Sequence, residues 1–228
     1  MKKILKTLLL SIVMVTSAYA ASADDPLRTM FLVDQLELRG NNAYSHTWDT
    51  TLYIGYDLDK LYLYSKGEAT SKGLEHTQND FVYSRAIMPF WDVQAGICYN
   101  KNTNTSNMWG EIAVAGLAPY WFETRAALLL NTNGNIGLRL DAEYEMLFTQ
   151  KLILTPKIEM DFYSEDDSML QIGSGLSSAE ATLYLRYEFV REFAPYIGIN
   201  WGKTFGNMRN NYEPVDKTVL IAGVRFWF

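Results

Sequence analysis

The residues with the clearest chemical potential are charged side chains that recur at every second position. Between residues 136 and 146, the even-numbered positions are apolar or aromatic, whereas the odd-numbered positions carry acids, an arginine and a glycine. Residues 180–189 show the same separation. Successive side chains of a β-strand point to opposite faces, so this spacing collects the charges on one face; helical spacing would scatter them around a cylinder. The pattern predicts strands with one apolar face and one charged face.

Both signs of charge occur on the predicted polar face, with acids in excess. The predicted set is Glu68, Arg85, Glu111, Glu123, Arg125, Arg139, Asp141, Glu143, Glu145, Lys157, Glu159, Asp161, Glu180, Arg186, Glu188 and Arg225. One interpretation is an ion-pair network that fills and rigidifies an interior. The other is a path for cations that the excess acid attracts. Strand parity gives no height along a barrel axis, so both interpretations stay open at this point.

Soft metal ligands form a second group of candidates, because thioether and thiolate sulfur favour Cu(I). The polar connections carry Met108, Met169, Met208, His46 and His76 in or beside them. Cys98 has the interior parity of its strand. No Met-x-x-Met or His-x-His run occurs, so loop polarity and a small interior residue are competing explanations.

Catalytic motifs are lacking. The two histidines, His46 and His76, have serine or acidic neighbours in sequence but no spacing typical of a triad. The chain has no Gly-rich phosphate loop and no CxxC motif, and a single cysteine permits no intramolecular disulfide. We expect a protein that is not an enzyme.

The elements that must position these side chains are long strands. We predict twelve, at 30–39, 47–57, 60–69, 79–88, 91–100, 107–117, 119–131, 135–148, 150–163, 176–189, 193–205 and 217–228. Most exceed the 5–6 residues typical of soluble sheets. Their length suits a tilted strand that crosses a bilayer.

The connections between these strands alternate in length. Tight connections fall at 57–60, 88–91, 117–119, 148–150 and 190–193, and longer polar ones at 40–46, 70–78, 101–106, 132–134, 164–175 and 206–216. This predicts an all-β fold, a closed antiparallel transmembrane β-barrel of about 12 strands with short periplasmic turns and longer external loops. A soluble lipocalin-like barrel would need an apolar interior, which the predicted inward acids argue against.

Residues 1–20 have the form of a signal peptide, with an alternative cleavage after residue 23. Lys2 and Lys3 precede a short apolar run, and Ala18-Tyr19-Ala20 fits a signal peptidase site. Residues 21–228 then form the barrel, in the outer membrane of a Gram-negative cell. The terminal Phe228 resembles the signal that outer-membrane assembly machinery recognises. The formal net charge of −6 makes nucleic acid an unsuitable partner.

Several ordered stretches resemble the copper resistance protein B family (CopB/PcoB), and the resemblance covers about residues 25–228. They include Asp25-Pro26-Leu27, Asp59-Lys60-Leu61-Tyr62-Leu63, Ile87-Met88-Pro89-Phe90-Trp91-Asp92, Gly116-Leu117-Ala118-Pro119-Tyr120-Trp121, Arg191-Glu192-Phe193-Ala194-Pro195-Tyr196 and Gly223-Val224-Arg225-Phe226-Trp227-Phe228.

This resemblance implies an outer-membrane barrel, in contact with lipid, that serves copper resistance and homeostasis. It implies binding or passage of copper ions and a periplasmic multicopper oxidase as a partner. Many members carry a Met- and His-rich segment before the barrel, but residues 21–24 contain neither residue type. No copper ligand is therefore transferred from the family. The alternative is a structural or receptor-like barrel whose lumen is locked by ion pairs and transports no copper.

Overall fold

The computed structural model describes residues 25–40, 44–103, 105–167, 172–211 and 215–228. The predicted signal peptide, residues 1–20 or 1–23, lies outside these residues and stays a prediction. No helix among the described residues has the length and apolar character needed to cross a membrane.

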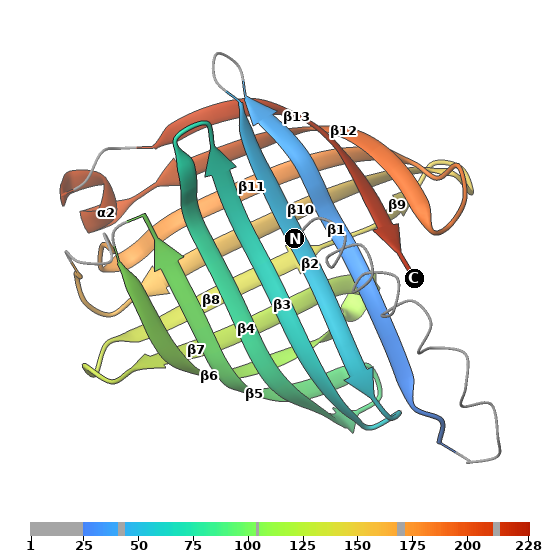
Figure 1. Ribbon diagram of the computed structural model, residues 1–228, viewed down its shortest axis with the longest axis horizontal. Helices are drawn as coiled ribbons and strands as arrows, with labels where there is room; N and C mark the ends of the chain where they lie inside the picture. The colour runs from blue at the N-terminus through green and yellow to red at the C-terminus, as the bar shows by residue number, and fades with distance from the viewer. Residues whose placement is uncertain (1–24, 41–43, 104, 168–171, 212–214) are drawn as a thin grey trace, which may run out of the picture.

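The described chain forms one closed antiparallel barrel (Figure 1). Its strands are β1 (Arg28–Gly40), β2 (Ser45–Gly55), β3 (Asp59–Thr70), β4 (Gly73–Met88), β5 (Trp91–Asn102), β6 (Ser106–Ala118), β7 (Phe122–Asn131), β8 (Ile136–Glu143), β9 (Met146–Leu147), β10 (Leu152–Tyr163), β11 (Gly175–Tyr187), β12 (Phe193–Thr204) and β13 (Asp216–Trp227). Each strand of the wall pairs with its neighbours in sequence, and β13 returns to pair with β1. The predicted twelve-stranded barrel is confirmed, because β8 and β9 together occupy the place of the predicted strand 135–148.

The seam of the barrel lies between the first and last strands. Phe31 and Phe228 exchange two backbone hydrogen bonds of 2.9 and 3.1 Å, and their rings lie 5.4 Å apart. A closed ladder leaves no unpaired strand edge, which is a requirement for a sheet surrounded by lipid. The aromatic C-terminus is therefore part of the wall.

The two ends of the barrel differ. One end, here called the short-turn end, carries the tight β2–β3, β4–β5 and β6–β7 connections and both termini of the sheet. At this end the 3-10 helix η2 (Pro119–Trp121) makes the β6–β7 turn, where Tyr120 adopts a φ of 69°. The opposite, long-loop end carries residues 164–167, residues 172–174 and the α2 helix (Gly206–Asn211). Figure 1 shows α2 projecting beyond the strands.

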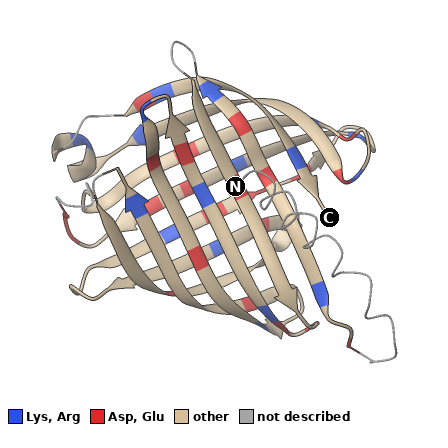
Figure 2. Ribbon diagram, viewed as in Figure 1, with Lys and Arg blue, Asp and Glu red and all other residues tan. Residues whose placement is uncertain are grey.

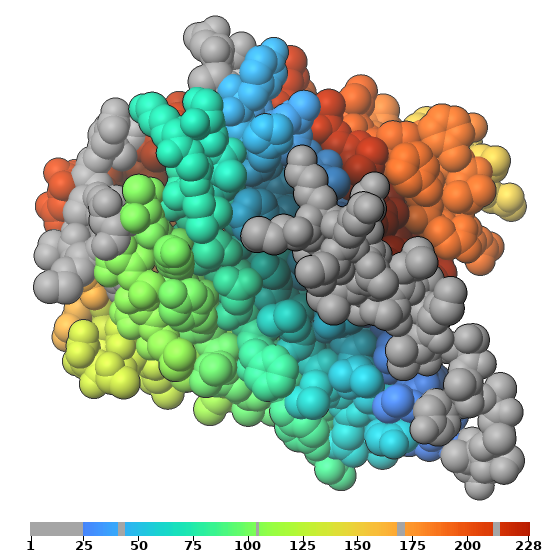
Figure 3. Space-filling model, viewed as in Figure 1, coloured from blue at the N-terminus to red at the C-terminus, as the bar shows by residue number. Residues whose placement is uncertain are grey.

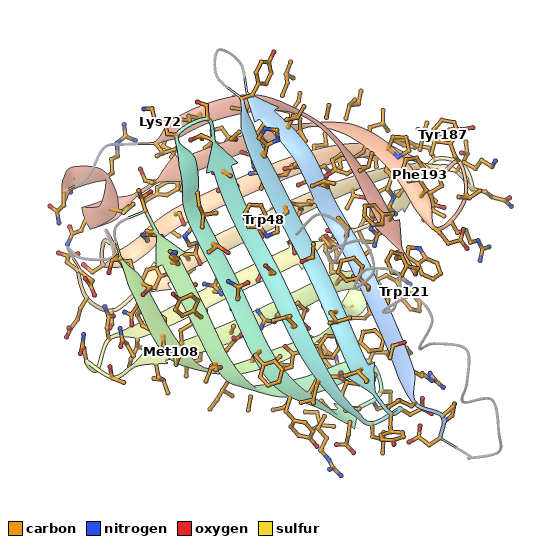
Figure 4. All side chains as sticks on the ribbon, in the orientation of Figure 1. Trp48, Lys72, Met108, Trp121, Tyr187 and Phe193 are labelled. Carbon is orange, nitrogen blue, oxygen red and sulfur yellow. The ribbon has the colours of Figure 1, made fainter. Side chains whose placement is uncertain are left out.

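One predicted loop is wrong. Residues 70–78 continue as paired strand except for a two-residue turn at Ser71 and Lys72. Figure 4 shows Lys72 at the tip of the β3–β4 hairpin. Glycine is required immediately after this turn, since Gly73 adopts a φ of +122°. The segment is polar because the hairpin extends into water. Its strands stay paired there, since pairing satisfies the backbone hydrogen-bonding groups whether or not lipid surrounds them.

The outer face of the barrel is apolar. Large exposed side chains such as Leu52, Leu63, Ile97 and Ile199 project from it, and Figure 3 shows the side chains of β2 to β6 packed side by side over the wall. Buried apolar clusters lie on the inner face instead. Cys98, Trp109 and Leu129 form one of them, and Tyr184, Tyr196 and Ile221 form another. An apolar exterior around a polar interior is the arrangement of a barrel in lipid.

Candidate functional site: the charged lumen

The predicted charged residues, apart from Arg85, face the interior of the barrel. They line its cavities, are buried against its inner wall, or pair with residues that do so. Figure 2 shows acidic and basic positions interspersed along the strands. Strand parity therefore brings residues that are distant in sequence into one shared volume.

Arg85 is a correction. It shares its face of β4 with Phe81 and Tyr83, both exposed, whereas Val82 and Ser84 point inward and are buried. The Arg85 side chain is 61% exposed and pairs with Asp59 at 3.2 Å, near the short-turn end. Both faces of β4 carry apolar residues here, so hydropathy alone did not identify the inner one.

Further charged residues face the lumen but were not among the predicted set. They include Asp34, Glu37, Arg39, Asp49, Lys66 and Asp80. The parity of β2 and β3 was sufficient to find Asp49 and Lys66. Asp80 was missed because the prediction assigned the wrong face of β4 to the interior. A β-bulge in β1 at Asp34 breaks the alternation, and the sequence carries no sign of it.

An arginine cluster is built on the inner wall of β4 to β7. The Arg125 guanidinium donates to the Glu111 carboxylate, donates to Gln94 Oε1 at 3.1 Å, and lies 3.6 Å from Asp80 Oδ2. It also lies 4.7 Å from the centroid of the Tyr64 ring. The side chains of Glu111 and Asp80 are at most 1% exposed. Buried carboxylates require such partners, because an unpaired buried charge is expensive.

A second arginine, Arg139, continues this cluster across the interior. Its guanidinium lies 3.6 Å from Asp80 Oδ2 and 3.3 Å from Asp161 Oδ1. The Ser178 hydroxyl donates to the other Asp161 oxygen at 2.9 Å. Arg139 therefore ties the β4 wall to β10 through two carboxylates.

Two lysines occupy the middle of the lumen. Lys66 Nζ lies 2.6 Å from Glu159, 3.3 Å from Asp141 and 3.6 Å from Asp49. Lys157 Nζ lies 3.4 Å from Asp49 and 3.5 Å from Glu159. These residues come from β2, β3, β8 and β10, so the ion pairs cross the interior between opposite walls.

A further cluster lies toward the short-turn end. Arg225 pairs with Asp34 at 2.7 Å and with Glu145 at 3.5 Å, and Arg186 pairs with Glu145 at 2.6 Å and with Glu188 at 3.6 Å. The bulge in β1 directs the Asp34 carboxylate into the lumen. The break in the ladder between β8 and β9 places Glu145 where both arginines reach it.

The space left by these side chains includes two cavities that hold more than a single water-sized volume. One, of about 400 Å³, opens among Asp34, Glu123 and Glu143 toward the short-turn end. The other, of about 220 Å³, lies among Glu68, His76 and neighbouring residues toward the long-loop end. The residues that line both are Asp49, Lys66, Gln78, Arg139 and Asp141. These five residues, here called the dividing layer, separate the two cavities.

Two acids of the larger cavity have no cation within ion-pair distance in the described part of the chain. Glu123 and Glu143 stand directly opposite each other on β7 and β8 and line the same cavity. Adjacent like charges are destabilising, so a cation placed between these two carboxylates would relieve their repulsion.

The predicted soft ligands are not brought together. Met108 is 53% exposed on the outer face of β6, where Figure 4 shows it pointing away from the barrel. Met208 lies on α2, and His46 lies on the outer parity of β2. His76 is exposed and bonds Asn102 through Nδ1, and Cys98 is buried beside Trp109. Met169 lies outside the described residues.

A resident metal centre does not fit this arrangement. Within the described ranges, no group of three or more His, Cys, Asp or Glu side chains has the geometry to hold a metal ion. The Cys98 thiol donates to Asn100 at 3.3 Å and packs in an apolar cluster, as expected for a small interior residue.

The closed barrel with an apolar exterior and a charged lumen defines the class: an outer-membrane β-barrel protein. Three solved barrels share its fold: the NanC porin (13% identity, TM-score 0.56, 87% of this chain and 99% of the porin), the KdgM porin (11%, 0.53, 86% and 99%) and Escherichia coli outer membrane phospholipase A (12%, 0.51, 87% and 92%). At these identities the likeness establishes the fold alone. The protein is located in the outer membrane, in contact with lipid.

The family follows from sequence. The model of the family described as "Copper resistance protein B precursor (CopB)" matches residues 27–228, so the chain belongs to this family. It is 37% identical to "Copper resistance protein B" of Escherichia coli over 210 residues, which span 90% of this chain and 71% of the relative. It is 33% identical over the same length to "Copper resistance protein B homolog" of Pseudomonas syringae pv. tomato. The resemblance noted from the sequence is thereby confirmed.

Proposed function

We propose that this barrel carries copper ions across the outer membrane through its lumen and performs no catalysis. The observation that carries the proposal is the acidic short-turn cavity, where Glu123 and Glu143 face each other without an ion-paired cation in the described residues. Acids outnumber lysines and arginines in the lining of this cavity, and an excess of one sign of charge within low-dielectric walls concentrates counter-ions. Membership of a family named for copper resistance selects copper as the cargo.

Transient contacts, and not a fixed site, suit such a role. Conduction requires binding strong enough for entry and weak enough for exit. The lumen offers scattered carboxylates and, among the described residues, no preformed metal cage, which agrees with passage more than with storage.

The test replaces Glu143 and Glu159 by Gln, together and singly, in cells that depend on this gene. Glu75→Gln is the matched control, because Glu75 is exposed at the long-loop rim of β4 and makes the same loss of charge outside the cavities. We expect the lumen variants to change cellular copper content or copper tolerance, and the control to leave both unchanged. Unchanged copper accumulation over a range of external copper would refute the proposal.

The second candidate function is a structural or receptor-like barrel with a locked lumen. The ion pairs that cross between opposite walls at Lys66 and Lys157 favour it. Copper flux into liposomes, with and without the purified protein, separates the two functions. Equal flux favours the locked barrel.

The proposal includes two partners. Phe228 at the seam is a suitable recognition signal for the outer-membrane assembly machinery, because it ends an apolar-alternating strand. A periplasmic multicopper oxidase is the expected acceptor or donor of copper on the periplasmic side, as the family resemblance implies. Deleting that oxidase should alter the copper tolerance conferred by the wild-type barrel, and unchanged tolerance would remove the oxidase from the proposal.

A further inference from the structure

Lys66 is one of two lumen cations that border both cavities. Arg125, Lys157 and Arg225 line the short-turn cavity, and Arg39 lines the long-loop cavity. Arg139 borders both, but its side chain is 8% exposed and is held by Asp80 and Asp161. The Lys66 side chain is 31% exposed. It is the most accessible cation of the dividing layer.

The Lys66 side chain also crosses the lumen. It starts on β3, and its ammonium contacts Asp141 on β8 and Glu159 on β10, which belong to the opposite wall. Four strands, β4 to β7, separate β3 from β8 along the sheet. A tether of four methylene groups thus spans the space between the cavities, and its ammonium is held by charge-assisted hydrogen bonds to Asp141 and Glu159.

The other contacts of the layer are arranged so that this tether can be released. Lys157 contacts Asp49 and Glu159, so two of the three carboxylates around Lys66 keep a cation when Lys66 leaves. Asp141, in contrast, has Lys66 as its ion-pair partner among the described residues. A lysine ammonium on a flexible stem changes rotamer more readily than a rigid, doubly anchored guanidinium.

We propose that Lys66 is the gate of the lumen: its ammonium bridge to Asp141 and Glu159 closes the passage between the two cavities, and its withdrawal opens a cation path past Asp141. Withdrawal leaves the dividing layer with an unpaired carboxylate, so the opened path prefers cations to chloride. The gate acts on any small cation, so its effect is not limited to the transport of copper.

The test measures ion conductance of the purified full-length protein in planar lipid bilayers with potassium chloride. Lys66→Met removes the charge and leaves the ammonium position empty, because the methionine side chain is one atom shorter. We expect the wild type to be closed most of the time and K66M to conduct steadily, with a reversal potential that indicates potassium selectivity. Lys66→Arg, which keeps the charge, should stay closed.

Lys203→Met is the matched control. Lys203 is also a strand lysine with an acidic partner, Asp216 at 3.5 Å, but it lies at the long-loop rim. The conductance of the K203M variant should equal that of the wild type. A K66M conductance equal to the wild type, or a K66M pore that prefers chloride, would overturn the gate.

Asp141→Asn provides a second arm that decides the question if K66M does not fold. It keeps Lys66 but removes one of the carboxylates that hold it, and should increase the open fraction about tenfold, as loss of one charge-assisted hydrogen bond predicts. Selectivity for potassium should be weaker than in K66M. An open fraction equal to the wild type would overturn the gate. Because no copper is present, failure of the copper phenotype and failure of the gate are separate results.

Discussion

Replacing Arg125 by Met should strongly destabilise the barrel. Arg125 is the ion-pair partner of Glu111 in the described residues, and the Glu111 side chain is 0% exposed. It also lies 3.6 Å from Asp80, whose side chain is 1% exposed but keeps Arg139 at the same distance. Removing one partner of a buried ion pair costs about 3–5 kcal/mol, because a charge is left without compensation.

The control for this prediction is the exposed arginine on the outer wall. Arg85 and Asp59 are 61% and 40% exposed, and water screens an exposed ion pair so that it contributes little to stability. We therefore expect Arg85→Met to lower the free energy of unfolding several times less than Arg125→Met. Both variants change the same residue type to the same residue, so they differ mainly in burial.

The assay is urea unfolding in detergent micelles, followed by tryptophan fluorescence and by the mobility shift of the folded barrel in electrophoresis. The double variant Arg125→Met/Glu111→Gln should recover part of the loss, since it removes the uncompensated charge. If Arg125→Met unfolds at the same urea concentration as Arg85→Met, the buried pair is not what holds this part of the wall.

Three other predictions concern the seam, the packing and the external loops. Deleting Phe228 removes two backbone hydrogen bonds at the seam and should lower the amount of barrel in outer-membrane fractions; normal insertion would refute the assembly-signal interpretation. Gly96→Ala should cost about 1–3 kcal/mol in urea unfolding, because a Cβ there would lie 2.0 Å from the Phe81 carbonyl oxygen, and an unchanged midpoint would contradict that contact. The Ser174 backbone N–H donates to the Asp166 carboxylate and holds its pKa below its ordinary value. This loop contact should therefore persist above pH of about 4, the ordinary pKa, and be lost as the pH falls through the lowered pKa; a carboxyl NMR titration with its midpoint at or above that value would contradict it.

Strand parity was sufficient for most of the lumen and failed where the backbone is irregular. In β8 and β11 every charged residue lies on one face, so positions such as Asp141 and Glu180 were predictable from spacing. In β4 both faces carry apolar residues, and Arg85 was placed on the wrong one. The bulge at Asp34 shifts the register by one residue. Beyond a bulge, the side chains that had pointed inward point outward. A sequence that carries no sign of the bulge therefore cannot show where this change occurs.

The candidate metal ligands show a second limit. His46 and Met108 are close to loops in the sequence, yet both lie on the outer face of the barrel. Cys98 shares a parity with polar residues, yet it lies in an apolar cluster. Proximity to a loop in the sequence does not determine which side of a closed wall a residue occupies at the rim. The residues that meet in the lumen come from strands on opposite walls.

The sequence by itself determined the barrel, its family and the chemical character of its two faces. These properties follow from local alternation and from ordered motifs, which persist whatever the strands later pair with. Only the tertiary structure decided which charges meet, because closing the sheet brings β3 opposite β8 and β10. It thereby placed Lys66 between two cavities and left Glu123 facing Glu143. Distances across a lumen depend on closure, tilt and side-chain reach, and none of these is encoded in the spacing along a single strand.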